Sequence, residues 1–291
     1  MVRKTKDQKQ SFISYLQKQF PDLQIEHSKY PDNKNLILGN VETAKVLLTA
    51  HYDTCAQMPI PNFIMPLNPG MSILYSLLIS IPLFLAIFLG NIFLNIFTDD
   101  FWIHYFISLT ICFGSVFLML CGPANKHNVN DNTSGVITLL EIYRNLSEHL
   151  KEKTALVFFD NEEKGLIGSA AFRKKHKKQI HNTLLINFDC VSDGDHILFA
   201  LSKKARKEYE TAFAEKIQST REKNVLIKKA EKVYYPSDQA GFPSSIAVAA
   251  LKHKKKFGYY MNRIHTKRDT ILDERNIQLL VDGTINFLNY I

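Results

Sequence analysis

The stretch Val46-Leu47-Leu48-Thr49-Ala50-His51-Tyr52-Asp53-Thr54 is an apolar run that ends in a histidine and an aspartate. The pattern recurs at 155–159, before Asp160-Asn161-Glu162-Glu163, and at 184–188, before Asp189. Such runs are typical of buried strands in a parallel or mixed sheet. Polar side chains just past the carboxyl ends of such strands converge on one crevice. The sequence therefore predicts an α/β fold with a polar site at the strand ends.

Helical patterns separate these predicted strands. Apolar spacing indicates an amphipathic helix over 8–20, a helix over 133–146 and a last helix over 273–290. The first clear strand is predicted at 46–49. Alternation of strands and helices indicates one sheet with helices on both faces.

Two long apolar stretches interrupt this alternation. Residues 71–97 carry no charge, and His104 is the only clearly ionisable side chain of 101–121. A membrane-spanning helix needs about 20 apolar residues, so both stretches qualify. We predict a transmembrane hairpin at 70–121, inserted into one discontinuous domain of residues 1–69 and 122–291. The alternative is a helical hairpin buried in a soluble core, but core helices normally carry a polar stripe.

Charge indicates which side of the membrane holds the domain. The turn Thr98-Asp99-Asp100 has no Lys or Arg, whereas Lys45 and Lys126 flank the hairpin on the domain side. Lys and Arg near membrane spans stay cytoplasmic. No signal peptide pattern is seen over 1–10. We therefore expect a multi-pass protein of the plasma membrane with a cytoplasmic catalytic domain.

Charge and cysteine content indicate which partners the protein can bind and whether it forms disulfides. The net charge is +8, with basic runs at 173–178, 203–207 and 252–256. These runs form either a solvated face or a surface for anionic lipid headgroups, and no nucleic-acid recognition motif accompanies them. None of the four cysteines forms a Cys-x-x-Cys pair, so neither a disulfide framework nor zinc bound by thiolates is expected.

Counting metal donors suggests a two-metal site. One zinc ion would take His51, Asp189 and one oxygen of Asp131. The other would take His265, Glu163 and the second oxygen of Asp131. Each zinc then has three protein ligands and one open position, as catalytic zinc requires. Alone, each residue has a plainer explanation: Asp131 could cap a helix, and His265 could be a surface residue.

Two carboxylates of these motifs are not assigned as metal ligands and could have other roles in the site. Asp53 could orient His51 by accepting from its second ring nitrogen, and Glu162 could accept a proton from the attacking water. Tyr235 is a candidate donor to the carbonyl oxygen of the substrate. Asp193 and Asp195 are interpreted as surface turn residues.

The order of these motifs resembles that of the di-zinc aminopeptidases typified by bacterial leucyl aminopeptidase and Streptomyces aminopeptidase S. Further matches are Asn130-Asp131-Asn132-Thr133-Ser134-Gly135, the run 159–169 and Ser237-Asp238-Gln239-Ala240-Gly241-Phe242. The resemblance implies a mixed, mostly parallel eight-stranded sheet between helices, of the zinc-exopeptidase type. It also implies that Glu162 is the base and Glu163 a ligand.

The activity implied is removal of amino-terminal residues from peptides with a free amino terminus, by a water that bridges two Zn²⁺ ions. Co²⁺ or Mn²⁺ are alternative metals. Another exopeptidase or a glutaminyl-cyclase-like enzyme on the same scaffold is an alternative function, although the adjacent Glu162 and Glu163 favour peptide hydrolysis. A non-catalytic, membrane-bound binding module is the alternative outside enzymes.

Overall fold

A mixed sheet of nine strands runs through the centre of the protein, in a computed structural model that describes residues 1–58 and 60–291. The strand order is β1-β2-β4-β3-β5-β8-β6-β7, and β9 pairs with β8. The pairs β3–β4, β3–β5, β5–β8 and β6–β7 are parallel, and the other four are antiparallel. The strands are β1 Gln24–Lys29, β2 Asp32–Leu38, β3 Val46–His51, β4 Thr154–Phe159, β5 Leu184–Phe188, β6 His196–Leu201, β7 Asn224–Lys229, β8 Ser245–Lys254 and β9 Gly258–Tyr260.

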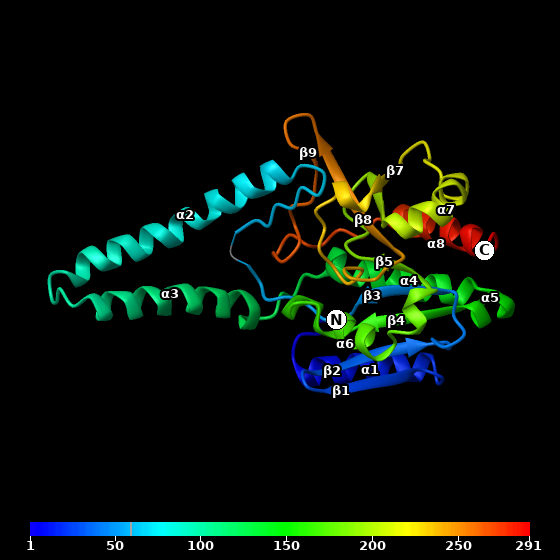
Figure 1. Cartoon of the computed structure of the whole chain (residues 1–291), viewed down its shortest axis with the longest axis horizontal. Helices are drawn as coiled ribbons and strands as arrows, with labels where there is room; N and C mark the ends of the chain where they lie inside the picture. Colours follow the sequence, from blue (N-terminus) through cyan, green and yellow to red (C-terminus); the bar gives the residue numbers. More distant parts are fainter. Residues whose placement is uncertain (59) are drawn as a thin grey trace.

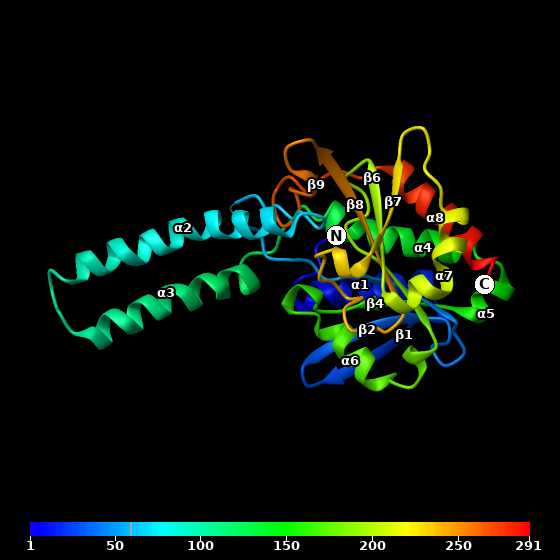
Figure 2. The same cartoon turned by 45° about the horizontal axis from the view of Figure 1, so that its top comes forward.

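Helices cover both faces of the sheet (Figures 1 and 2). On one face, α1, α4, α7 and α8 bury side chains such as Leu16, Leu139, Phe213 and Phe287 in the largest hydrophobic cluster. On the other face, Phe172 of α6 packs against Leu47 and Phe159. The helices of the domain are α1 Lys6–Gln19, α4 Gly135–Asn145, α5 Glu148–Lys153, α6 Ile167–Lys175, α7 Lys203–Lys216 and α8 Glu274–Leu288.

The predicted α/β architecture is confirmed. Each of the three apolar runs forms a fully buried strand, and because β3 lies between β4 and β5 and is parallel to both, their carboxyl ends meet at one edge. The sheet has nine strands instead of eight, and only half of its pairings are parallel. The strands β1 and β2 precede the first predicted strand. Since β1 is a largely exposed edge strand with polar residues, it contains no apolar run to mark it.

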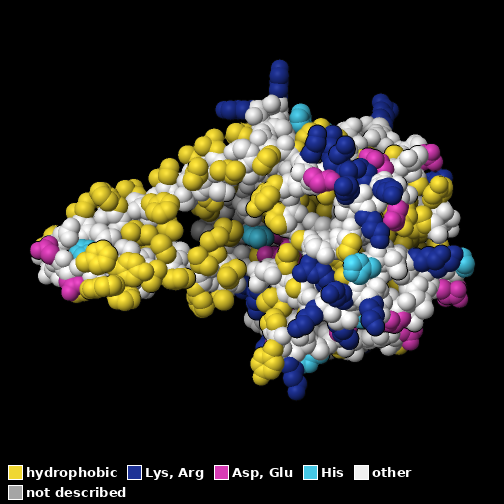
Figure 3. All heavy atoms as spheres, in the orientation of Figure 1, with side chains coloured by type: hydrophobic (Ala, Val, Ile, Leu, Met, Phe, Trp, Pro, Cys, Tyr) yellow, Lys and Arg dark blue, Asp and Glu magenta, His cyan; other side chains and the backbone are white. Residues whose placement is uncertain are grey.

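The two apolar stretches form a pair of helices that projects from the domain (Figure 1). Helix α2 spans Pro69–Leu94, capped by Asn68, and α3 spans Phe101–Cys121, capped by Asp100. None of their residues is buried, so the alternative of a hairpin inside a soluble core is wrong. Both helices are long and apolar enough to cross a membrane. Figure 3 shows apolar side chains along their length and acidic side chains at the tip.

Polar side chains join the two helices near the tip. The ring of His104 lies 2.6 Å from Asn91 Oδ1 through Nδ1, and Asn91 Nδ2 donates to Ser108 Oγ at 2.9 Å. Hydrogen bonds between helices are among the forces that associate apolar helices away from water. These contacts fix the pairing of α2 with α3.

Candidate active site

Three of the predicted ligands converge at the end of β3 and β5. His51 is the last residue of β3, Asp189 follows β5, and Asp131 lies just before α4. His51 Nε2 is 3.2 Å from Asp131 Oδ1 and 3.5 Å from Asp189 Oδ1. All three side chains are buried. Their donor atoms are close enough together to hold one metal ion.

The second oxygen of Asp131 faces a different pair of residues. Asp131 Oδ2 is 2.9 Å from His265 Nε2, which is 3.3 Å from Glu163 Oε2. The remaining oxygen of Glu163, Oε1, is buried and has no hydrogen-bond partner among the described residues. Burial raises the pKa of Glu163 to about 8, although the nearby charge of His265 opposes the shift. The residues present therefore fit a metal cation on each side of Asp131.

Asp53 lies next to this cluster and makes different contacts from the one predicted. His51 Nδ1 is 3.4 Å from Asp53 Oδ1 but forms no hydrogen bond with the described residues. Instead the two oxygens of Asp53 accept from the backbone N–H groups of Glu162 at 3.0 Å and Glu163 at 3.2 Å. Asp53 therefore fixes the turn that carries the two glutamates. Sequence reasoning did not anticipate these bonds because they join residues about 110 positions apart.

The turn around Asp131 is held by buried polar side chains. Asn132 Oδ1 accepts from the backbone of Gly135 and Cys190, which links the turn to the end of β5. Asp269 accepts from the backbone N–H groups of Asn130 and Asp131. Gly135 is required because a Cβ there would lie 2.3 Å from the carbonyl oxygen of Phe188. The motif at 130–135 is thus explained by packing as well as by its aspartate.

Left-handed backbone conformations occur at one proposed ligand and directly beside two other site residues. His265 has φ +60°, Cys190 directly after Asp189 has φ +57°, and Asn161 directly before Glu162 has φ +53°. Residues other than glycine rarely adopt such angles, and they cluster where side chains must be aimed precisely at a functional site. Strain of this kind supports a functional role for the loops that carry His265, Asp189 and Glu162.

Comparison with protein families agrees with this geometry. Residues 116–287, more than half of the chain, match the sequence model of Peptidase family M28. The chain belongs to Peptidase family M28. His51 and Asp53 lie before the matched segment. They join the other site residues through the pairing of β3 with β4 and β5.

Solved structures share the fold of this M28 peptidase. The LapA aminopeptidase of Legionella pneumophila is 13% identical with a TM-score of 0.56, over 98% of this chain and 66% of that one. A Zn-dependent exopeptidase of Parabacteroides distasonis is 14% identical with a TM-score of 0.54, over 99% and 91%. A glutaminyl cyclase of Porphyromonas gingivalis is 16% identical with a TM-score of 0.50, over 92% and 83%. The chain thus spans about two thirds of the length of LapA. Comparison with curated proteins found no match.

The M28 assignment and the donor set identify a zinc-dependent peptidase. Imidazole and carboxylate donors suit zinc, and the described residues supply them on both sides of Asp131. The expectation of a zinc peptidase that acts on peptides is confirmed.

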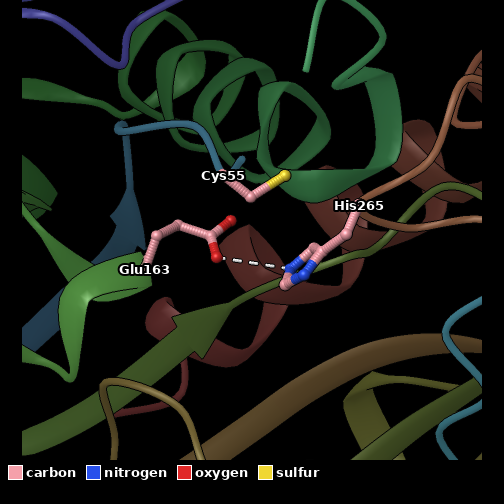
Figure 4. A group of neighbouring side chains, drawn as sticks. All are labelled: Cys55, Glu163 and His265. Carbon is pink, nitrogen blue, oxygen red and sulfur yellow. Dashed lines mark ion pairs between the residues drawn. The ribbon is translucent and has the colours of Figure 1, made fainter. Parts of the chain in front are cut away.

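Two residues of the site were not assigned from the sequence. The Cys55 thiol lies within ligand range of Glu163 and His265 (Figure 4). The Cys-x-x-Cys criterion depends on local spacing, so it does not detect a thiol that folding brings close to other donors. Asp238 is fully buried, with neither oxygen hydrogen-bonded to a described residue, and burial raises its pKa to about 7. Its only signal in the sequence was the motif 237–242.

Other predicted residues have different surroundings from those expected. The hydroxyl of Tyr235 donates to the backbone carbonyl of Asp189 at 3.2 Å, so it supports a ligand, and contact with substrate stays a prediction. The prediction that Asp193 is a surface turn residue is wrong. It is buried and paired with Lys252 and Arg263, which neutralise its charge. Asp195 is exposed, as predicted.

Arg3 connects the loop that follows β3 to the loop that carries Asp131. Its guanidinium donates to the carbonyl of Tyr52 and, at 2.9 Å, to Thr133 Oγ1, while its backbone N–H donates to Thr54 Oγ1. Burial lowers its pKa to about 10, and the charges of Asp53 and Asp131 oppose that shift. Arg3 therefore adds positive charge beside a cluster of carboxylates.

Replacing Arg3 by methionine is expected to destabilise the zinc-loaded protein. The two guanidinium bonds that join Arg3 to Tyr52 and Thr133 are lost, at about 1.5–3 kcal/mol each. We expect Tm to fall by roughly 6–24 °C, since 1 kcal/mol corresponds to about 2–4 °C at this size. Thermal unfolding of Arg3→Met measures this, and Arg221→Met, at an exposed position, is the control. Equal Tm values for the two variants would contradict the role of Arg3.

Proposed function

We propose that this M28 peptidase is a membrane-tethered, di-zinc aminopeptidase that removes amino-terminal residues from peptides. The observation that carries the proposal is the position of Asp131. Its Oδ1 faces His51 and its Oδ2 faces His265, at 3.2 and 2.9 Å. A carboxylate placed between two histidines in this way suits two cations better than one.

The assignment of ligands follows from these contacts. His51, Asp189 and Asp131 would hold one zinc ion, and His265, Glu163 and Asp131 the other. Bound zinc would polarise the scissile carbonyl and bring the pKa of water near neutrality. Co²⁺ or Mn²⁺ could replace zinc at imidazole and carboxylate ligands.

Glu162 is the general base in this proposal. It accepts a proton from the attacking water and returns it to the leaving amine. Its carboxylate is half-buried beside the ligands, and the loss of solvation raises its pKa well above the ordinary value. A higher pKa makes a carboxylate a better proton acceptor. Asp53 keeps Glu162 in place through the backbone bond at 3.0 Å.

A panel of amino-acid p-nitroanilides and amino-terminally blocked peptides tests the aminopeptidase function. We expect release of p-nitroaniline from substrates with a free amino group and none from the blocked peptides. Cleavage of blocked peptides would indicate a different exopeptidase or an endopeptidase. Ring closure of glutaminyl peptides with release of ammonia, and without hydrolysis, would indicate a glutaminyl cyclase instead.

The tether is the helix pair α2–α3, Pro69–Leu94 and Phe101–Cys121. The unburied apolar surface of both helices supports insertion into a bilayer. The domain of residues 1–69 and 122–291 would lie on the cytoplasmic side of the plasma membrane, because Lys45 and Lys126 flank the helices there. Trp102 and Tyr105 near the tip would anchor at the outer interface. The basic runs of the domain would attract anionic lipid headgroups.

Cysteine labelling in intact cells tests this topology. In a background without Cys112 and Cys121, we expect Thr98→Cys at the tip to react with an impermeant maleimide. Lys177→Cys, at an exposed position of the domain, should react only after lysis. The opposite pattern would place the domain outside the cell. Recovery of the protein in the soluble fraction would refute the tether.

A further inference from the structure

The cluster of proposed metal ligands lies close to the point where the helix pair joins the domain. Helix α3 ends at Cys121. Directly after it, Ala124 pairs with Ala56, and Asn125 N donates to the carbonyl of Cys55 at 3.1 Å. Cys55 is within ligand range of Glu163 and His265. The four residues 122–125 span at most about 14 Å, so the end of α3 is close to the site.

The segment that leads into α2 is tied to the same loops. Met58 N donates to the carbonyl of His265 at 2.7 Å, and Ile64 pairs with Met261 through two backbone bonds. The ring of Phe63 stacks on Tyr260 with centroids 5.8 Å apart. Helix α2 then begins at Pro69. Both ends of the helix pair are therefore anchored to backbone around the metal ligands, which fixes the distance between site and helices.

The site is more exposed to solvent on the side that carries the helix pair. The side chain of His265 is 24% exposed, whereas that of His51, deeper in the sheet, is 1% exposed. Figure 3 shows a histidine and acidic side chains in the hollow where the helix pair meets the domain. A substrate that reaches the ligands from solvent would thus approach from the side that carries the helices.

Helix lengths indicate where the bilayer surface would lie. The 21 residues of α3 rise by about 32 Å, which barely spans a hydrocarbon core of about 30 Å. The last turn of α3 would then sit at the hydrocarbon boundary. Lys4 Nζ donates to the carbonyl of Leu120 in that turn at 2.7 Å, at the level where lysine side chains meet lipid headgroups. The headgroup layer adds only about 5–8 Å on each side.

From these positions we infer that the substrates are membrane-anchored peptides whose free amino termini lie at the bilayer surface. The inference rests on the proposed aminopeptidase function and names its substrate class. An amino terminus a few residues from its own anchor can reach a site this close to the lipid. Water adds across the first peptide bond: the amino-terminal residue leaves as a free amino acid, and the rest of the peptide keeps its anchor and gains a new amino terminus.

Anchoring also favours encounter. Enzyme and substrate confined to one surface meet at an effective concentration far above that of a dilute soluble peptide. This advantage is kept with a short linker only if the site is near the bilayer. A site far from the lipid would need a linker long enough to bridge the gap.

Hydrolysis by zinc-loaded protein in phosphatidylcholine vesicles tests the inference. One peptide with a free amino terminus is compared in three forms: soluble, coupled through its carboxyl end to phosphatidylethanolamine by two Gly/Ser residues, or coupled by twenty. Such linkers have root-mean-square lengths of about 8 and 25 Å. In vesicles that hold both partners, we expect the short-linker form to be cleaved roughly tenfold or more faster than the soluble form at equal total concentration.

The outcomes separate the two proposals. Cleavage of the soluble peptide without faster cleavage of the short-linker form overturns the membrane-anchored substrate class and leaves the aminopeptidase function standing. If only the long-linker form of the anchored peptides is cleaved, the site lies too far from the lipid. That result also overturns the membrane-anchored substrate class. Cleavage of none of the three overturns the aminopeptidase function and this inference together.

A measurement independent of activity tests the geometry. Single fluorophores are attached at Lys164→Cys, next to Glu163, or at Lys216→Cys, at the end of α7; both positions are exposed. Lys164 lines the same cavity as Lys4, whereas α7 lies at the end of the domain away from the helix pair (Figure 1). Quenching by lipids with spin-labelled headgroups should be stronger at residue 164. Equal quenching, or stronger quenching at residue 216, overturns the proposed closeness of site and bilayer.

Discussion

The Glu162→Gln protein is expected to bind zinc as the unchanged protein does and to lose activity by about 10²- to 10⁴-fold, the usual contribution of general-base catalysis. Glutamine keeps the size of the side chain but cannot accept a proton. The Asp53 carboxylate accepts from the backbone of Glu162 and not from its side chain, so the turn should keep its shape. Steady-state hydrolysis of an amino-acid p-nitroanilide gives the loss, and elemental analysis gives the zinc content.

Glu163→Gln is the matched control because it makes the same chemical change one residue later. Glu163 faces His265 at 3.3 Å and is assigned as a ligand. Its substitution should lower the zinc content as well as the activity. Unchanged activity in Glu162→Gln would remove Glu162 from the mechanism. Loss of zinc in Glu162→Gln, with none in Glu163→Gln, would reverse the two assignments.

The second large effect is expected from Asp131→Asn. The unchanged protein should contain about two zinc ions per chain, and a content of zero or one would refute the two-metal proposal. An asparagine has one carbonyl oxygen, so it cannot serve both the His51 side and the His265 side. We expect the zinc content to fall to one ion or fewer. Metal-ion catalysis contributes several kcal/mol, so activity should fall by about 10³-fold or more.

Asp195→Asn provides the control for this substitution. Asp195 has a side chain that is 72% exposed and lies outside the site, so the same change there should leave zinc content and activity unaltered. Thermal unfolding of both variants shows whether the fold is kept. If folded Asp131→Asn protein retains two zinc ions, Asp131 does not bridge them.

Local patterns predicted the central strands well. The runs at 46–50, 155–159 and 184–188 are recognised because each buried strand is apolar on both faces. They form β3, β4 and β5, and their order along the edge follows from pairing. The strands β1, at the edge, and β2, next to it, were not predicted. The polar face of β1 meets water, so its sequence resembles that of a loop.

The sequence by itself determined the family, the α/β type of fold and the candidate donor residues, because motifs and apolar runs are properties of neighbouring residues. Only the tertiary structure decided which atoms meet. The two oxygens of Asp131 reach different histidines, and Asp53 binds the backbone of the glutamate turn. The tertiary structure also brings Cys55 near Glu163 and His265, and it places the helix pair next to the site. These contacts join segments about 70 or more residues apart, and such distances are fixed by strand pairing and packing, which no local pattern encodes.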